Sequence, residues 1–143
     1  MSRFWHVTYR IQYRLLAIID PLVVSFWRRF GVGNVVALEV TRRDGAGQRS
    51  RLLGLLHAGG RRYVGHPNGH VGWTQDLAAS RRATLVFRDG ERRELIATPL
   101  DLGAERELAI LATSQHPFPG NLMYRLGRRH IRAVGVFFRL DDG

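Results

Sequence analysis

The spacing of hydrophobic and polar residues divides the chain into two parts with different periods. The first part follows a helical period, because Arg3, Arg10 and Arg14 fall within about 40° of one another on a helical wheel. Apolar residues fill the remaining wide arc of that wheel. From Val35 onward, short runs rich in β-branched residues replace this period and predict strands.

A broad apolar face beside a narrow arginine stripe is typical of an interfacial helix. Asp20 and Pro21 interrupt this helix and suit the start of a second short helical segment at residues 21–30. Neither piece supplies the roughly 20 uninterrupted apolar residues that a membrane-spanning helix needs. Two interpretations stay open: the N-terminal segment lies on a membrane surface, or it packs on the domain or in a dimer interface.

After residue 34 the pattern predicts short strands and two helices, with Asp89-Gly90 as the strongest hairpin signal in the chain. Residues 122–127 are not assigned. The strands are expected at residues 34–41, 51–57, 61–66, 82–88, 92–100 and 131–140, and the helices at residues 72–80 and 103–114.

Short strands joined by hairpins, with helices at the ends and between them, predict an α+β fold. The sheet is expected to be antiparallel or to close into a small barrel. We expect an amphipathic helical segment at residues 1–30 and one domain, which holds the functional site, at residues 31–143.

Composition supports a folded domain and excludes several chemistries. The chain has 143 residues, of which 45% are hydrophobic and 10% aromatic, enough for a core without covalent staples. Cysteine is absent, which excludes disulfides, catalytic thiols and thiolate metal ligands. His66 and His70 flank Pro-Asn-Gly and make a poor metal pair, so no metal is expected.

Nothing at the start resembles a cleavable secretory signal, so we expect a cytoplasmic location, or a peripheral one at the inner face of the cell membrane.

The formal net charge is +10, and all 22 basic residues are arginines. This usage most simply reflects GC-rich codons, and the alternative is that the chain binds an anion: a phosphorylated cofactor, an anionic membrane surface or nucleic acid. Base stacking would use strand aromatics such as Tyr63, Phe87 and Phe137, but their aliphatic neighbours suit a core better. We therefore expect no nucleic-acid partner.

One stretch, TRRDGAGQRSR at residues 41–51, is a candidate anion site. Gly45 and Gly47 allow positive φ, so backbone N–H groups could converge on an anion. Arg49 and Arg51 share a face of an extended chain and could fork onto a phosphate. A hairpin turn with exposed arginines is the other interpretation. The stretch is neither a P-loop nor a dinucleotide fingerprint, because the residues and setting of both motifs are missing.

Later motifs change this interpretation. Arg51 is followed four residues later by Leu55, then by the Gly-rich GHPNGHVG, and then by Trp-x-x-Asp-Leu-x-Ala beginning at Trp73. This order resembles the deazaflavin-dependent nitroreductase and quinone reductase family, a branch of the split β-barrel flavin and deazaflavin oxidoreductases. The segments AERELA and IRAVGVFFRL resemble a later helix and the closing strand of that family. The similarity covers roughly residues 34–140.

The resemblance implies a split β-barrel that binds coenzyme F-420 (8-hydroxy-5-deazaflavin), with flavin mononucleotide as the alternative. Its hydride would pass to a small hydrophobic electron acceptor such as a quinone, nitro compound or activated alkene, so the cofactor carries the chemistry. Tyr124 is the candidate catalytic residue, as proton donor or substrate contact, and a structural tyrosine is the other interpretation. The implied cofactor-binding residues are Gly47, Gln48, Arg49, Arg51, His66, Pro67, Asn68, Trp73 and Asp76.

The chain departs from the family pattern at two places. DGAGQ stands where the family has Arg-Lys-Ser-Gly, so the lysine is absent and Asp44 is present, and Asp76 replaces an asparagine. Arg43 is a candidate substitute for the lost cation. These departures keep a second hypothesis open: a non-catalytic or differently loaded barrel that holds a lipid, haem or flavin mononucleotide in the same cleft. A homodimer is also an open expectation.

Overall fold

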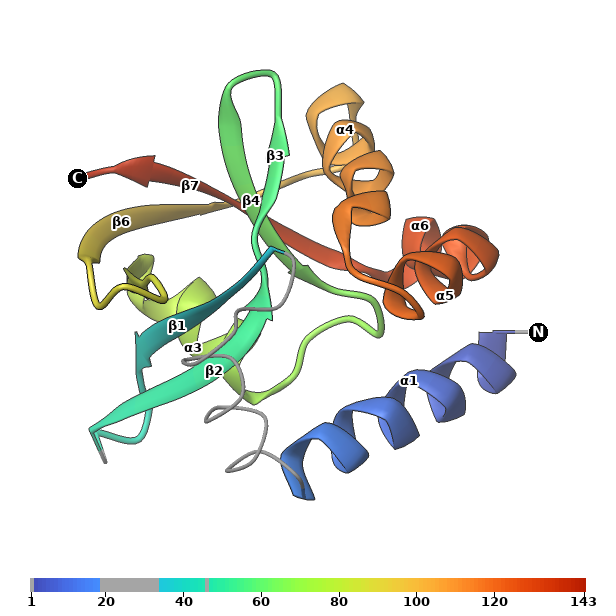
Figure 1. The fold of residues 1–143 in the computed structure, drawn as a ribbon, viewed down its shortest axis with the longest axis horizontal. Coiled ribbons are helices and arrows are strands. Elements are labelled where there is room, and N and C mark those ends of the chain that lie inside the picture. The colour runs from blue at the N-terminus through green and yellow to red at the C-terminus, as the bar shows by residue number, and fades with distance from the viewer. Residues whose placement is uncertain (1, 19–33, 46) are drawn as a thin grey trace.

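The computed structural model describes residues 2–18, 34–45 and 47–143 (Figure 1). The second helical segment expected at residues 21–30 lies outside the described residues. In chain order, the elements are α1 (Ser2–Ile18), β1 (Val35–Thr41), β2 (Gln48–Gly54), β3 (Leu56–Ala58), β4 (Arg61–His66), α3 (Gly72–Ser80), β5 (Arg82–Val86), β6 (Arg92–Pro99), α4 (Ala104–Ala112), the 3-10 helix η1 (Thr113–Gln115), α5 (Gly120–Leu126), α6 (Arg128–Val134) and β7 (Val136–Asp142).

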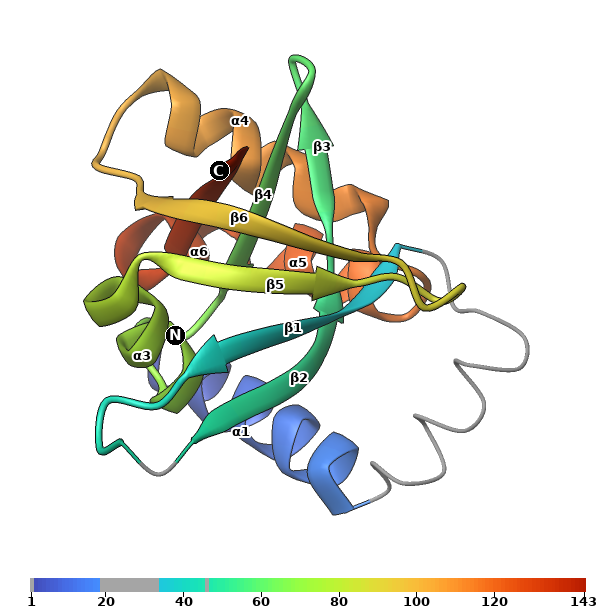
Figure 2. The ribbon, with the colours of Figure 1, turned by 90° about the vertical axis from the view of Figure 1, so that its left-hand side faces the viewer.

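The strands form one antiparallel sheet in the order β2-β1-β5-β6-β7-β4-β3. β2 and β3 occupy opposite ends of this order, although only Leu55 separates them in the chain. The sheet therefore curls into a half-barrel, because its two ends must meet at Leu55 (Figure 2). The predicted α+β fold with an antiparallel sheet or small barrel is confirmed.

Two hydrophobic clusters hold the fold together. The concave side of the curled sheet encloses Leu38, Val64, Leu85 and Phe138, and α3 contributes Leu77 to this interior. The second cluster lies between β3, β4 and β7 and the helices α4, α5, α6 and α1; its members include Tyr9, Leu56, Tyr63, Ala109, Ile110, Tyr124, Ile131 and Phe137. Removing these side chains from water is the main stabilising contribution to both halves of the fold.

The N-terminal helix packs on the domain through one face and leaves the opposite face in solvent. The Tyr9 side chain is fully buried, and its hydroxyl donates a hydrogen bond to the backbone oxygen of Met123 at 2.8 Å. Phe4, Val7 and Ile11 point away and are 63%, 47% and 53% exposed. None of the helices in the described ranges is long and apolar enough to span a membrane.

Several predicted elements are confirmed. Helices lie at residues 72–80 and 104–112, and Asp89-Gly90 turns the β5–β6 hairpin. In that turn, the Glu91 N–H donates to the Asp89 carboxylate at 2.9 Å, and Gly90 adopts a φ of +89°. The sequence signal and the local hydrogen bonds therefore agree.

Two predictions are wrong in detail. The single strand expected at residues 51–57 is two strands, because Asn34 binds both backbone groups of Leu55 (2.9 and 3.1 Å) and holds the chain in a bend there. The strand expected at residues 131–140 begins only at Val136, since residues 128–134 form α6. Its buried Ile131 packs in the second cluster, and tertiary packing overrides the β propensity of this segment.

Candidate functional site

A buried carboxylate gathers two arginines where the β1–β2 turn meets α3. The Asp76 side chain is 3% exposed. Arg43 donates to Asp76 Oδ1 from its backbone N at 3.2 Å and from Nε at 2.8 Å, while Arg49 Nε lies 3.3 Å from Oδ2. Burial raises the pKa of Asp76, but the Arg43 hydrogen bonds and the charge of Arg49 outweigh it, so the net pKa lies below the usual range. Asp76 is therefore an ionised anchor for the basic turn.

The Arg49 guanidinium lies directly against the first residue of α3. A Cβ atom added at Gly72 would overlap Arg49 Nη1, so glycine leaves the room that the guanidinium fills. Gly72 begins a nine-residue helix whose N-cap, Val71, is extended. Backbone N–H groups in the first turn of a helix lack helical acceptors and carry partial positive charge. A cation thus packs against the N-terminal residue of a helix, and the two positive charges together favour an anion.

Arg51 extends this basic surface along β2. In the register of the sheet, Arg49 lies opposite Val40 and Arg51 opposite Leu38, so both arginines are on the concave face of the sheet. The Arg51 side chain is exposed and has no ion pair within the described residues. The predicted sharing of one face by Arg49 and Arg51 is therefore confirmed.

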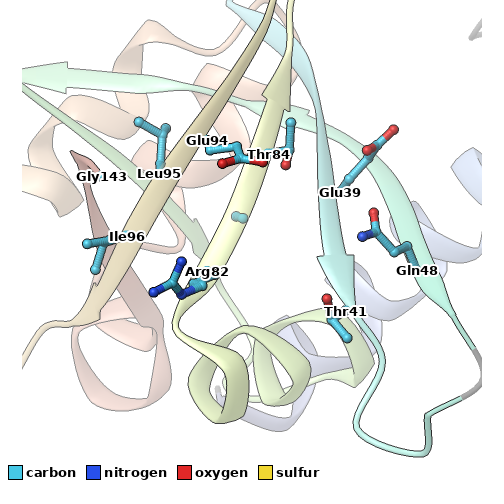
Figure 3. A pocket seen from close by; sticks show the side chains of 10 residues that line it. Glu39, Thr41, Gln48, Arg82, Thr84, Glu94, Leu95, Ile96 and Gly143 are labelled. Carbon is cyan, nitrogen blue, oxygen red and sulfur yellow. The ribbon is translucent and has the colours of Figure 1, made fainter.

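Gln48 points to the other side of the sheet. It pairs with Thr41 and lines a cavity of about 330 Å³ on the convex face of β1, β5 and β6 (Figure 3). Glu39, Glu94 and Arg82 are the charged residues of this cavity. The structure therefore separates Gln48 from the two arginines that sequence reasoning grouped with it.

The described residues of the glycine stretch form a hairpin turn. Gly45 and Gly47 have φ of +75° and +97°. The Arg42 N–H donates to the Gly47 oxygen at 2.9 Å, and the Gly45 N–H donates to the Arg42 oxygen at 3.2 Å. Arg42 is paired with Asp44 at 3.0 Å. Two N–H groups of the turn are thus used within the turn itself.

His66 and Pro67 are buried, and Asn68 is half-buried. His66 is 5% exposed, and burial lowers its pKa to about 4, so the ring is neutral at pH 7. Its Nδ1 accepts the Asn68 N–H at 3.2 Å. The Asn68 side chain donates to the backbone oxygen of His6 at 2.9 Å and contacts His130 Nε2 at 2.8 Å. This segment therefore joins the barrel to α1 and α6.

Trp73 and Tyr124 are both packed side chains. Trp73 is 7% exposed and belongs to the concave cluster. Tyr124 is 7% exposed and lies between Tyr9 and His116, with ring centroids 5.7 and 4.6 Å away. In this conformation neither side chain presents more than an edge to a ligand.

Three site features were not predicted from the sequence. Gly72 was not predicted as a site residue, because the sequence does not show which side chain packs against a glycine. His116 sits against Gly54, where a Cβ would overlap its ring, and burial lowers its pKa to about 4. His130 is 4% exposed beside His6. No group of three or more metal-ligating side chains occurs among the residues that the structure describes.

Solved structures with the same fold differ in what they bind. The haem storage protein HutZ from Vibrio cholerae matches with a TM-score of 0.56 and 10% identity, over 87% of this chain and 90% of its own. An F420-H2-dependent reductase, FDR-A, matches with a TM-score of 0.57 and 14% identity, over 76% and 94%. A third, described as a domain-swapped dimer, matches with a TM-score of 0.55 and 18% identity, over 76% and 80%. No protein-family profile and no curated protein matches the chain.

These similarities show the fold of the chain but do not identify its ligand, which is inferred from the residues of the site. The chain has the split β-barrel fold of these structures. Arg43 and Arg49 around Asp76 and Gly72, with Arg51 two residues further along β2, are called the basic corner below.

Proposed function

We propose that this split barrel is an oxidoreductase that binds coenzyme F-420 and reduces a small hydrophobic acceptor such as a quinone, nitro compound or activated alkene. The observation that carries the proposal is the Arg49 guanidinium seated on Gly72 at the start of α3. The bound coenzyme would supply a hydride; the protein would hold its phosphate and orient its ring. Split-barrel structures that include an F420-H2-dependent reductase support the choice of coenzyme.

The residues present fit a phosphate-bearing group. Asp76 fixes Arg49 through Nε, which leaves the two terminal nitrogens of the guanidinium for an anion. Arg51 contributes a second guanidinium on the same face of β2, with no ion pair to any residue that the structure describes. The carboxylate balances only part of the charge, because one Asp76 pairs with both Arg43 and Arg49. The basic corner is thus pre-organised for an anion before any ligand arrives.

Spectroscopic titration of the purified protein with coenzyme F-420, flavin mononucleotide and haem tests this function. We expect F-420 to bind more tightly than either alternative. Arg51→Ala should weaken F-420 binding by about tenfold or more, since one charge-assisted hydrogen bond contributes about 1.5–3 kcal/mol. Gly72→Ala should act in the same direction by pushing Arg49 off α3.

Arg129→Ala is the matched control, because it removes an exposed arginine from α6, outside the basic corner. Unchanged F-420 affinity in both Arg51→Ala and Gly72→Ala would reject this placement of the cofactor. Turnover is then measured with a quinone and a nitro compound. Tight binding of F-420 without reduction of either compound would show that the protein binds the coenzyme but is not an enzyme for these acceptors.

A binding protein loaded with haem, lipid or flavin mononucleotide is the second candidate. The observation that favours it is that Asp76 pairs with both Arg43 and Arg49. Less positive charge is then available to bind the acidic tail of coenzyme F-420. HutZ, a haem storage protein, shares the fold. In the same titration, a haem absorbance shift at stoichiometric concentration would select this alternative.

We further propose that the outer face of α1 contacts an anionic membrane surface. Phe4, Val7 and Ile11 form an exposed apolar stripe, and α1 contains arginines but no acidic residue. Co-sedimentation with vesicles containing anionic lipid should fall at least tenfold in the double variant Phe4→Ser/Ile11→Ser. Thr8→Ala is the control, and equal sedimentation of all three proteins would exclude this surface.

A homodimer is proposed on the convex face of β1, β5 and β6, where no helix of the described chain covers the sheet (Figure 3). Glu94 and Arg82 lie on this face, so two copies related by a twofold axis can pair opposite charges. Light scattering on the eluting protein should give twice the chain mass of 16.3 kDa. A Glu94→Arg substitution should return it to the monomer, and a monomeric wild-type protein would reject the proposal.

A further inference from the structure

The contact between α1 and the barrel is built on histidines. The rings of His6 and His130 meet edge to face, with centroids 4.5 Å apart. The Tyr9 ring is stacked 6.2 Å from His130 and donates its hydroxyl proton to the Met123 oxygen. Asn68 completes the contact by donating to the His6 backbone oxygen at 2.9 Å. These groups tie one face of α1 to α5, α6 and the segment before α3.

Asn68 decides which nitrogen of His130 carries the proton. Its amide nitrogen donates to the His6 carbonyl, so its Oδ1 is the atom that faces His130 Nε2 at 2.8 Å. An oxygen acceptor requires a donor, so neutral His130 is protonated at Nε2 and unprotonated at Nδ1. The Nδ1 atom is buried and has no hydrogen-bond partner among the described residues.

Protonation of neutral His130 at Nδ1 is therefore unfavourable while α1 is docked. It would put a positive charge and an unpaired N–H in a site that is 4% exposed. Among the residues that the structure describes, the titratable side chains that contact the His130 ring from other elements are His6 and Tyr9 of α1, and neither is a carboxylate. Its own helix adds Arg128, Arg129 and Arg132, of which Arg132 is paired with Glu107. Burial and the charge of His6 accordingly lower the pKa of His130.

We propose that α1 is an acid-released element, which leaves the barrel when His130 takes up a proton while the sheet stays folded. The sign follows from linkage: a group whose pKa is lowered in the docked state favours docking above its ordinary pKa of about 6.5, and this contribution is lost as the pH falls below it. α1 is attached through few contacts at one face, whereas each strand of the sheet is held by a ladder of hydrogen bonds, so α1 opens first. This inference does not depend on the proposed cofactor.

Hydrogen–deuterium exchange of the whole chain, corrected for the intrinsic effect of pH on exchange, tests the release. We expect protection of residues 5–11 to fall at least tenfold between pH 7.5 and 5.0, while β5 and β6 keep theirs. His130→Gln retains a donor near the Nε2 position and cannot take up a proton, so its α1 protection should not change with pH over this range. His57→Gln, an exposed histidine of β3, is the matched control and should behave as wild type.

Full protection of α1 at pH 5.0, or the same loss in His130→Gln as in wild type, would overturn the proposal. If His130→Gln loses protection in β5 and β6 at pH 7.5, the substitution has unfolded the domain and a second measurement decides. The His130 ring is then titrated by NMR in the wild-type chain. Its titration must coincide with the loss of α1 protection, and titration in a separate pH range rejects His130 as the trigger.

Discussion

Arg106 donates a hydrogen bond from Nη2 to the backbone oxygen of Gly135 at 2.8 Å, across 29 positions of the chain. The same nitrogen contacts the oxygens of Ile131 and Arg132 at 3.2 and 3.1 Å. These carbonyls lie at the end of α6, where the Ile131 oxygen also accepts the Gly135 N–H at 2.7 Å and the later acceptors have no partner within the helix. A buried guanidinium of α4 thus caps the C-terminus of α6, and its charge is favourable there because that end carries partial negative charge.

Replacing Arg106 by methionine should lower the free energy of unfolding by about 2–4 kcal/mol, because it leaves buried carbonyl oxygens without donors. Urea unfolding followed by circular dichroism measures the change. Arg106→Lys should recover part of it by keeping the charge. A loss under about 0.5 kcal/mol, the usual range for surface substitutions, would mean that water replaces the guanidinium at no cost.

Asp76→Asn should separate stability from anion binding. The asparagine oxygen can still accept from Arg43, but its amide group would confront Arg49 Nε, so we expect the unfolding free energy to fall by about 1–3 kcal/mol. Affinity for inorganic phosphate should rise, because the basic corner gains one net positive charge. Equilibrium dialysis and urea unfolding measure the two effects, with Asp89→Asn in the β5–β6 turn as the control. Weaker phosphate binding would show that the positioning of Arg49 by Asp76 outweighs the negative charge of the carboxylate.

Burial of His66 makes the fold sensitive to acid. Its pKa is lowered from 6.5 to about 4, so the unfolded chain binds a proton that the folded chain resists. The stabilisation is complete above pH 6.5 and declines to about pH 4, by on the order of 3 kcal/mol. Thermal unfolding across this range should be less dependent on pH in His66→Asn, whose side-chain oxygen can still accept from the Asn68 N–H. If the unfolding temperature of His66→Asn depends on pH as in the wild-type protein, other groups cause the acid sensitivity. His70→Asn, at an exposed position, is the control.

The sequence predicts the parts of this molecule that depend on local chemistry. Strand runs, the Asp89-Gly90 turn and the shared face of Arg49 and Arg51 follow from periodicity and backbone preference alone. α6 does not, because the Arg106 cap that satisfies its last carbonyls is 25 or more residues away in the chain. The role of Asp76 was likewise hidden, since the sequence identifies the residue but not the partner 33 positions earlier that holds it.

The site shows the same limit. His66, Asn68 and Trp73 stand at motif positions, yet the fold buries His66 and Trp73, and it uses the half-buried Asn68 side chain to hold α1. Only tertiary contacts determine which face of a motif stays open. The basic corner was found because its charges are close together in the chain, and its neighbour Gly72 was missed because the Arg49 side chain that fills its space comes from another element.

The short edge strand β3 is protected by a side chain. Gln115 accepts the His57 N–H at 2.9 Å and donates to the His57 oxygen, so one amide satisfies both backbone groups of His57 as a neighbouring strand would. Unpaired groups on an exposed edge promote pairing with another chain. Gln115→Ala should therefore lower stability by about 1–2 kcal/mol and increase aggregation on heating. Unfolding midpoints and light scattering during a temperature ramp measure both, with the neighbouring exposed Ser114→Ala as the control. If Gln115→Ala is less stable but does not aggregate, the Gln115 amide only stabilises β3. The short length of β3, three residues, would then protect this edge of the sheet by itself.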